Sequence, residues 1–355
     1  MSAIRAIGVF IACTCAHAFA QTGPTIVGIG YRPPPPHIYM TITAGQILTL
    51  QVAGLSTVLP IGTVINAAAT PLPTNLSVFS VVLTENTAIA GELSFPMPML
   101  SVSQVDPCGD PSDPTPDCAI TYITVQIPFE VVPPWGGSST GAILTVFENG
   151  QPSKGFLADL VSINVHIVTT CGYFAGTYPS PCSSVVTHAD GTAVTMSSPA
   201  KPGETVVIYA WGLGKTLTPV NSGEPTPLPP DGDVDGLQAQ NGVIGVQFDF
   251  APNAGASQVI PKVRDPAILY AGLTPGQIGL YQINVRLPAQ FPGVRACDGV
   301  FVLSNLTISV GGAPINYTPP VMSSYDGAAI CVQPQPADRR NPDDKTVTPS
   351  RGGKP

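Results

Sequence analysis

The sequence predicts an all-β protein of the sandwich type, and three observations lead to this fold class. Apolar and polar residues alternate at many places with period two, the pattern of a strand with one buried face. The 41 prolines and 36 glycines among 355 residues interrupt the chain too often for long helices. Beyond the N-terminus, no apolar stripe has helical spacing. Many short strands separated by turn residues favour a sandwich over a barrel.

The first element is a predicted signal peptide covering residues 1–20. Arg5 supplies a positive charge, a short apolar run follows, and Ala18 and Ala20 form a small-x-small cleavage site. The apolar run is too short to span a bilayer. Lipid attachment at Cys13, within "FIAC", is the alternative. We therefore expect a secreted, extracellular protein with no integral membrane span.

The strands that follow are predicted from their alternation. Tyr281, Ile283, Val285 and Leu287 are apolar, and the residues between them are polar, so this segment predicts a strand. The preceding residues 269–279 contain the glycines and proline of a turn. The same alternation predicts strands at three further places, residues 48–52, 123–127 and 306–310.

An internal repeat predicts two domains. Three pairs of segments carry it: "AGQILTLQVAGL" from Ala44 with "PGETVVIYAWGL" from Pro202, "YITVQIP" ending at Pro128 with "YQINVRLP" ending at Pro288, and "NGQP" at Gly150 with "GGAP" at Gly312. All three pairs are separated by about 160 residues, which favours tandem units of one fold. We predict the divisions 1–20 (signal peptide), 21–168 (first β-sandwich domain), 169–333 (second β-sandwich domain) and 334–355 (disordered tail).

Removal of the signal peptide lowers the number of cysteines from eight to six. An even number in an exported chain favours disulfides. Sequence order suggests three local pairs among the 15 connectivities that six cysteines allow: Cys108 with Cys118, Cys171 with Cys182, and Cys297 with Cys331. None of these spacings is the C-x-x-C of a thiolate zinc site.

The charge of the chain excludes one class of partner. The chain has 14 Lys and Arg residues and 22 Asp and Glu residues, which gives a net charge of −8. The chain therefore lacks the basic surface that a nucleic-acid backbone requires. We expect an extracellular protein or a polysaccharide as the partner.

Several segments together resemble known families. "HADGTAVTMSSPAKPGETVVIYAWGLGKT", "ILYAGLTPGQIGLYQINVRLP" and "LTISVGGAPI" are similar to an uncharacterised C-terminal domain of secreted acidobacterial proteins. The opening strands of both halves also resemble IPT/TIG domains, which have an immunoglobulin-like fold. The resemblance implies two tandem immunoglobulin-like sandwiches that serve as surface or adhesive modules and have no known catalytic residues.

Two motifs of enzymes occur in unsuitable contexts. "GSSTG" places Ser139 at the position of a serine nucleophile, but a strand follows instead of a helix. "GLGKT" ends like a phosphate-binding loop, but Tyr209 stands where the first glycine of that motif belongs. His37, His166 and His188 are too scattered to suggest a metal site or a proton relay. We therefore predict no catalytic residues.

One acidic motif suggests a ligand. In "DGDVDG", Asp231, Asp233 and Asp235 alternate before Gly236, which resembles a loop whose oxygen ligands converge on Ca²⁺. Gly242 stands where an EF-hand has its twelfth-position Glu, so a solvated acidic loop is the alternative. Calcium is the one cofactor that the sequence suggests.

The predicted function is that of a secreted, non-catalytic structural or interaction module, which acts in extracellular adhesion or protein binding. A carbohydrate-binding module is the alternative, in which Trp135 or Trp211 would stack on sugar rings. A secreted hydrolase component that uses Ser139 is a further alternative.

Overall fold

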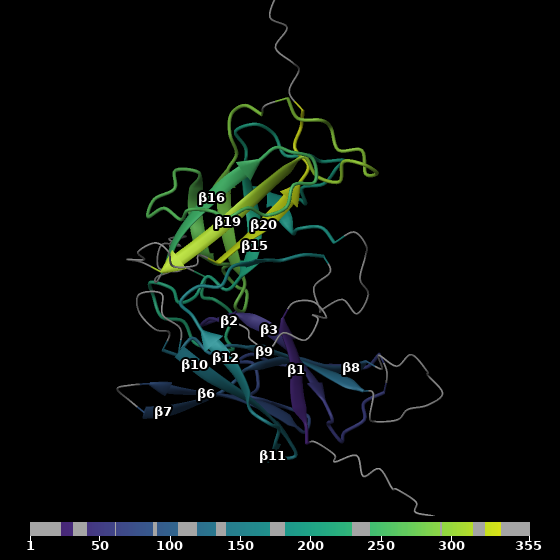
Figure 1. Cartoon of the computed structure of the whole chain (residues 1–355), viewed down its shortest axis with the longest axis vertical. Coiled ribbons are helices and arrows are strands. Elements are labelled where there is room, and N and C mark those ends of the chain that lie inside the picture. The colour runs from purple at the N-terminus through teal and green to yellow at the C-terminus, as the bar shows by residue number, and fades with distance from the viewer. Residues whose placement is uncertain are drawn as a thin grey trace, which may run out of the picture.

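The computed structural model describes most of the chain. The described residues are 23–30, 41–60, 62–87, 91–105, 119–132, 140–170, 182–228, 242–291, 293–314 and 324–334. All regular elements in these ranges are strands, which confirms the all-β prediction. Figure 1 shows the strands of residues 25–160 in the lower part and most later strands in the upper part. Within the described ranges, no helix is long and apolar enough to cross a membrane.

The N-terminal half, residues 23–160, contains two sheets. The first has the order β1-β3-β9-β8-β4, with β1 Thr25–Gly30, β3 Ile47–Ala53, β9 Ile120–Gln126, β8 Met99–Val105 and β4 Val64–Asn66. The second has the order β2-β12-β10-β6-β5, with β2 Thr41–Ile42, β12 Phe156–Leu160, β10 Thr140–Glu148, β6 Phe79–Thr87 and β5 Asn75–Leu76. β11 Gln151–Pro152 pairs with β10, and β7 Gly91–Pro96 pairs with β6. The pairings are antiparallel, except that β2 runs parallel to β12.

The C-terminal half, residues 166–334, also contains two sheets. The first has the order β13-β15-β18-β17, with β13 His166–Ile167, β15 Thr205–Trp211, β18 Tyr281–Arg286 and β17 Ile268–Leu273, and β14 Val186–His188 pairs with β15. The second has the order β16-β19-β20, with β16 Gly242–Asp249, β19 Leu306–Pro314 and β20 Ser324–Ile330. The last strand of the N-terminal half ends at residue 160 and β13 begins at 166. The division into domains at 168 and 169 stays a prediction.

The predicted strands form where the alternation indicated. In β18, Tyr281, Ile283 and Val285 are buried, and the polar residues between them are partly exposed. β3 differs, because its polar residues Thr49 and Gln51 are buried as well. The Thr49 hydroxyl lies 2.9 Å from the Thr124 hydroxyl of the neighbouring strand, so its polar group is satisfied within the sheet.

Two of the three repeat anchors have equivalent places in the fold. In the N-terminal half Leu50 of β3 lies opposite Ile123 of β9, and in the C-terminal half Ile208 of β15 lies opposite Ile283 of β18. The repeated segments therefore form the same antiparallel strand pair in the same register. The third anchor is not equivalent, because Gly150 lies in the turn between β10 and β11 and Gly312 lies within β19.

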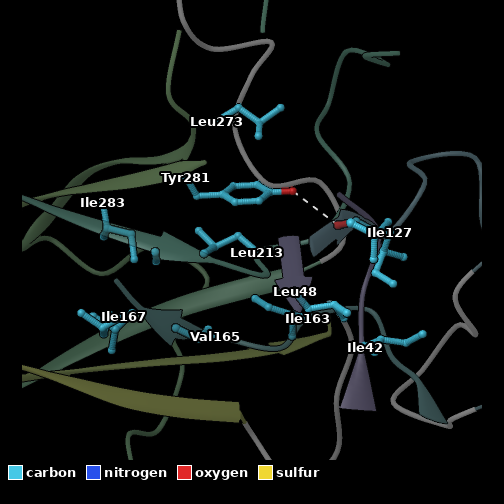
Figure 2. Close-up of a cluster of buried hydrophobic side chains, with 14 of the residues drawn as sticks. Ile42, Leu48, Ile127, Ile163, Val165, Ile167, Leu213, Leu273, Tyr281 and Ile283 are labelled. Carbon is cyan, nitrogen blue, oxygen red and sulfur yellow. Dashed lines mark hydrogen bonds between the residues drawn. The ribbon is translucent and has the colours of Figure 1, made fainter. Parts of the chain in front are cut away.

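One hydrophobic core cluster extends through both halves (Figure 2). Figure 2 shows Tyr281 beside Leu213 and near the N-terminal-half residues Leu48 and Ile127. The Tyr281 hydroxyl is buried and donates to the carbonyl of Gly214. The two halves are therefore packed against each other.

We call the contact between the halves the junction. It consists of the connector 161–165, the segment 212–228 and the turn 274–280. Gly212 and Gly214 have φ of 82° and 83°, where glycine is favoured. A Cβ at Gly212 would lie 1.9 Å from the carbonyl oxygen of Asn164, so the two backbones approach too closely for any side chain. "GLGKT" therefore follows β15 directly, as a closely packed part of the junction.

Candidate functional site

The structure tests only part of the predicted site. The predicted calcium ligands Asp231, Asp233 and Asp235 lie outside the described residues, and so do Ser139, Trp135 and His37. Within the described ranges, there is no group of three or more side chains suited to hold a metal ion. Calcium binding by "DGDVDG" stays a prediction.

The cysteines are partly described. Cys297 and Cys331 form a disulfide with their Cα atoms 6.0 Å apart, which confirms this predicted pair. Cys182 also takes part in a disulfide. Its predicted partner Cys171 lies outside the described residues, as do Cys108 and Cys118, so these two pairings stay predictions.

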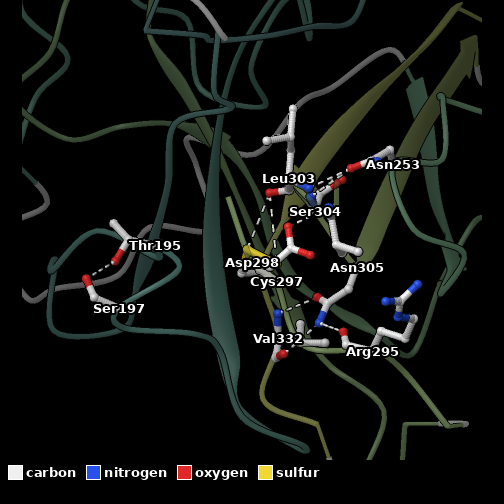
Figure 3. The surroundings of a disulfide bond; sticks show 12 residues. Thr195, Ser197, Asn253, Arg295, Cys297, Asp298, Leu303, Ser304, Asn305 and Val332 are labelled. Atoms are coloured by element: carbon white, nitrogen blue, oxygen red, sulfur yellow. Dashed lines mark hydrogen bonds between the residues drawn. A yellow bond between two sulfur atoms is a disulfide. The ribbon is translucent and has the colours of Figure 1, made fainter. Parts of the chain in front are cut away.

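The Cys297–Cys331 disulfide lies within a group of loops at the end of the C-terminal half (Figure 3). We call these the distal loops, and they comprise residues 188–200, 250–254, 293–305 and 331–334. Backbone bonds tie them together, since Ala200 donates to the carbonyl of Cys331 and Gln333 donates to that of Ala200. Segments far apart in the sequence therefore form one structure around the disulfide.

Asp298 organises the most exposed of these loops. One oxygen of its carboxylate accepts the N–H groups of Val300, Phe301 and Val302, at 2.9, 2.7 and 2.9 Å. These bonds to the charged form hold the pKa of Asp298 below its usual value. A single carboxylate therefore fixes the first part of this loop.

Asn253 fixes the other side of the same loop (Figure 3). Its side-chain oxygen accepts the N–H groups of Leu303 and Ser304, and its amide donates to the carbonyl of Phe301 at 2.6 Å. The Asn253 backbone has φ of 53°, a left-handed conformation that asparagine tolerates. Together Asp298 and Asn253 accept every backbone N–H from residue 300 to 304.

The loop held in this way exposes apolar side chains. Val300 and Phe301 are 72% and 79% exposed, while Val302 between them and Leu303 is buried. Met196 is exposed as well, and a Cβ at Gly299 would lie 3.3 Å from its sulfur, so the two loops touch. We call Met196, Val300, Phe301 and Leu303 the apolar tip. Burial of Val302 anchors the loop, while the tip residues face outward.

A polar cluster joins His188 and Glu204 to Ser198, in the loop that also carries Met196. His188, at the end of β14, has its Nδ1 2.5 Å from Glu204 Oε1. Its Nε2 lies 3.2 Å from both the carbonyl oxygen and the hydroxyl of Ser198. Glu204 also accepts the N–H of Lys201 at 2.7 Å. The carboxylate of Glu204 raises the pKa of His188, although partial burial acts in the opposite sense.

The contacts from Ser198 to His188 and from His188 to Glu204 resemble the arrangement of a serine hydrolase triad, but two features oppose catalysis. The N–H of Ser198 donates to the Thr195 hydroxyl, and Pro199, which follows the serine, has no N–H to stabilise an oxyanion. His188 also contacts the carbonyl of Ser198, which is a suitable acceptor for a protonated imidazole. We interpret the cluster as a latch, which ties Ser198 in the loop 192–200 to the end of β14 and, through His188, to Glu204 just before β15.

The latch predicts a pH dependence of stability. Because the pKa of His188 is raised in the folded state, its contribution is fully present below the unfolded value of about 6.5 and is lost as pH rises through the folded pKa. Replacing His188→Gln should therefore lower the free energy of unfolding by about 1 kcal/mol at acidic pH and by less at alkaline pH. Urea unfolding of both proteins across this range measures the difference.

His166 provides a control of opposite sign. It lies in β13, and burial lowers its pKa, although Asp326 acts to raise it. Its effect on stability is therefore absent above about pH 6.5 and destabilising as pH falls below that value. His166→Gln should remove this acid destabilisation. The latch is contradicted if the His188→Gln difference is constant across the pH range.

A second charged cluster lies at the junction. Glu85 of β6 is buried, and its carboxylate accepts the N–H of Val132 at 3.0 Å. Burial raises the pKa of Glu85 and lowers that of Lys215, a basic residue whose charge acts on it. Glu130 accepts from the Ser222 hydroxyl at 2.5 Å. The Glu130–Ser222 bond and the charge interaction between Lys215 and Glu85 connect the two halves, so we assign this cluster to the junction.

The contact between His188 and Glu204 could have been predicted from the sequence, whereas the exposure of the apolar tip could not. "HADGT" and "PGETVVI" flank an antiparallel strand pair, in which His188 lies opposite Val206. That register brings His188 near Glu204. Pairing the two segments as antiparallel strands would have predicted this contact. The apolar run "GVFVL", which follows Cys297 and Asp298, has the pattern of a buried strand. The sequence therefore contains no sign that most of its side chains are exposed.

Comparison with known proteins gives no family. No protein-family model matches the chain, and no curated protein matches it. The adhesin InvE of Yersinia pseudotuberculosis is similar at 10% identity and a TM-score of 0.20, over 88% of this chain and 59% of that one. The C-terminal domain of the AgI/II polypeptide BspA of Streptococcus agalactiae is similar at 11% identity and a TM-score of 0.18, over 86% and 99%.

These similarities are too low to transfer a function. The chain spans 59% of the InvE chain that it matches. The resemblance to the acidobacterial domain and to IPT/TIG domains stays a prediction.

Proposed function

We propose that the chain is an extracellular, non-catalytic adhesion module that contacts its partner through the apolar tip. The observation that supports this is the exposure of Val300 and Phe301 on a loop fixed by a disulfide, Asp298 and Asn253. An exposed apolar side chain on a mobile loop would lose conformational entropy on binding. In this loop the conformational entropy is already lost when the protein folds, so binding costs less entropy.

The size of the tip supports the same role. Its four side chains expose roughly 400 Å² of mostly apolar surface, which is comparable to the largest apolar patch of a typical monomer and is often functional. Phe301 lies among smaller aliphatic neighbours, an arrangement typical of an anchoring residue. The disulfide and the predicted signal peptide support an extracellular location.

The alternative of a carbohydrate-binding module has less support. Trp211 lies at the end of β15, where it pairs with His166 and is half-buried. A sugar-binding platform requires an aromatic face open to solvent. The described aromatic side chain with the greatest exposure in the distal loops is Phe301, and its neighbours in the sequence, Val300 and Val302, are aliphatic, whereas a sugar site needs polar groups that fix the ligand.

The experiment is a binding assay with cell-envelope fragments. The mature protein should cosediment with them, and Phe301→Ser should lower the bound fraction at least about tenfold, because the loss of a central aromatic anchor commonly has such an effect. Ile260→Ser is the matched control. Ile260 is 76% exposed but lies beside Gly245 of β16, outside the distal loops.

The proposal requires a difference between the two variants. Equal binding by Phe301→Ser and the wild type, with both proteins folded by circular dichroism, would contradict a role for the tip. A loss shared by Ile260→Ser would indicate general hydrophobic adsorption instead.

A further inference from the structure

We propose that the partner of the apolar tip is the surface of a zwitterionic phospholipid bilayer, into whose interfacial region Val300, Phe301 and Leu303 insert. This inference rests on the proposed function and names its partner. The protein would be bound peripherally, by a loop, without an integral span.

Most backbone polar groups of the tip loop already have hydrogen-bond partners within the protein, so the loop can leave water at little cost. A loop that enters an apolar medium must satisfy its N–H groups internally, since each unpaired group is costly there. In this loop the N–H groups of Val300, Phe301 and Val302 donate to Asp298, and those of Leu303 and Ser304 donate to Asn253. Two carbonyls are also paired, since Val302 accepts from the N–H of Asp298 and Phe301 accepts from the Asn253 amide.

The side chains suit a lipid surface better than a protein pocket. Residues 299–303, "GVFVL", include no polar side chain. The roughly 400 Å² of the tip is about half of the 800 Å² that each partner buries in a standard protein interface. A bilayer needs no such area, because lipid adapts to a small protrusion and binding increases with the apolar surface inserted.

The charges around the tip indicate which lipid. Lys201 follows the distal-loop segment 188–200 and Arg295 lies within the segment 293–305. Both are exposed, so their long side chains are available to headgroup phosphates. The carboxylate of Asp298 is exposed and interacts electrostatically with Arg295, and the whole chain has a net charge of −8. Anionic lipid would therefore repel the protein as a whole, so we commit to phosphatidylcholine as the probe.

The experiment uses the mature protein and protein-free phosphatidylcholine vesicles. We expect cosedimentation, weakened at least about tenfold by Phe301→Ser and unchanged by Ile260→Ser. The expected affinity is weak, on the order of the 10⁴ M⁻¹ of a single acyl anchor. A second readout is fluorescence, since Phe301→Trp should shift its emission to the blue on vesicles and Ile260→Trp should not.

The outcomes separate this inference from the proposed function. Absence of both cosedimentation and the blue shift overturns the lipid assignment, and envelope binding that still requires Phe301 would then point to a protein or polysaccharide partner. Binding only to vesicles containing phosphatidylserine, insensitive to Phe301→Ser, also overturns it. If the protein binds neither vesicles nor envelopes, both proposals fail.

Discussion

Replacing Gly212→Ala should destabilise the protein by more than about 3 kcal/mol, because the new methyl group would overlap a backbone atom. The Cβ position is 1.9 Å from the carbonyl oxygen of Asn164 and 2.9 Å from its carbonyl carbon. Asn164 in turn donates its N–H to the Gly212 carbonyl at 2.7 Å. The clash can therefore be relieved only by separating β15 from the connector 161–165, which breaks this hydrogen bond.

Gly191→Ala is the control that separates the steric clash at Gly212 from the cost of a left-handed backbone conformation. Gly191 has φ of 86°, close to that of Gly212, but a Cβ there would meet nothing within 4 Å. Its replacement should cost only the roughly 1–2 kcal/mol of a left-handed alanine. Urea unfolding of both variants measures the difference, and equal losses would show that the junction is not closely packed in solution.

Removing the Cys297–Cys331 disulfide should have an effect of similar size. The bond closes a segment with a sequence separation of 34 residues, and the chain-entropy model gives about 4 kcal/mol for a loop of this length. Replacing both cysteines with alanine should lower the free energy of unfolding by up to this amount. Thermal unfolding under non-reducing conditions measures it, with the Cys182 disulfide left intact.

The same variant tests how the tip is held. Asp298 follows Cys297 directly, so loss of the bond should loosen the base of the loop and raise amide exchange at Val300 and Phe301. Amide exchange in β3, in the other half of the molecule, serves as the control. A variant with unchanged stability and exchange would show that Asp298 and Asn253 fix the loop without the disulfide.

Much of the fold was predictable from the sequence, because alternation and turn residues act locally. β18 and the turn before it follow directly from the pattern of "GLTPGQIGLYQINVRLP". The repeat also predicted that the strand containing Leu50 and the strand containing Ile208 are equivalent, and their registers agree. The burial of Gln51 was not predictable, because it depends on which segment covers the outer face of a sheet.

The site was less predictable, because exposure depends on contacts between distant segments. Val302 is buried and Phe301 is exposed, although both belong to one apolar run. The backbone of this run is held by Asn253, about fifty residues away in the chain, through bonds to Phe301 and Leu303. The acidic motif at Asp231 was conspicuous in the sequence, whereas the carboxylate that organises the tip, Asp298, was not.

The junction has a mechanical consequence. If the tip is held on a surface and the chain is pulled from β1, the tension must pass from one half to the other. Two separate segments of the N-terminal half bind residues 222–223 there through three bonds. Leu72 donates to the carbonyl of Gly223, and in residues 126–129 Phe129 donates to the Ser222 hydroxyl while Gln126 accepts from the N–H of Gly223. These bonds share the load and must rupture together, so the attached molecule should resist shear as a single stiff unit instead of extending at a hinge.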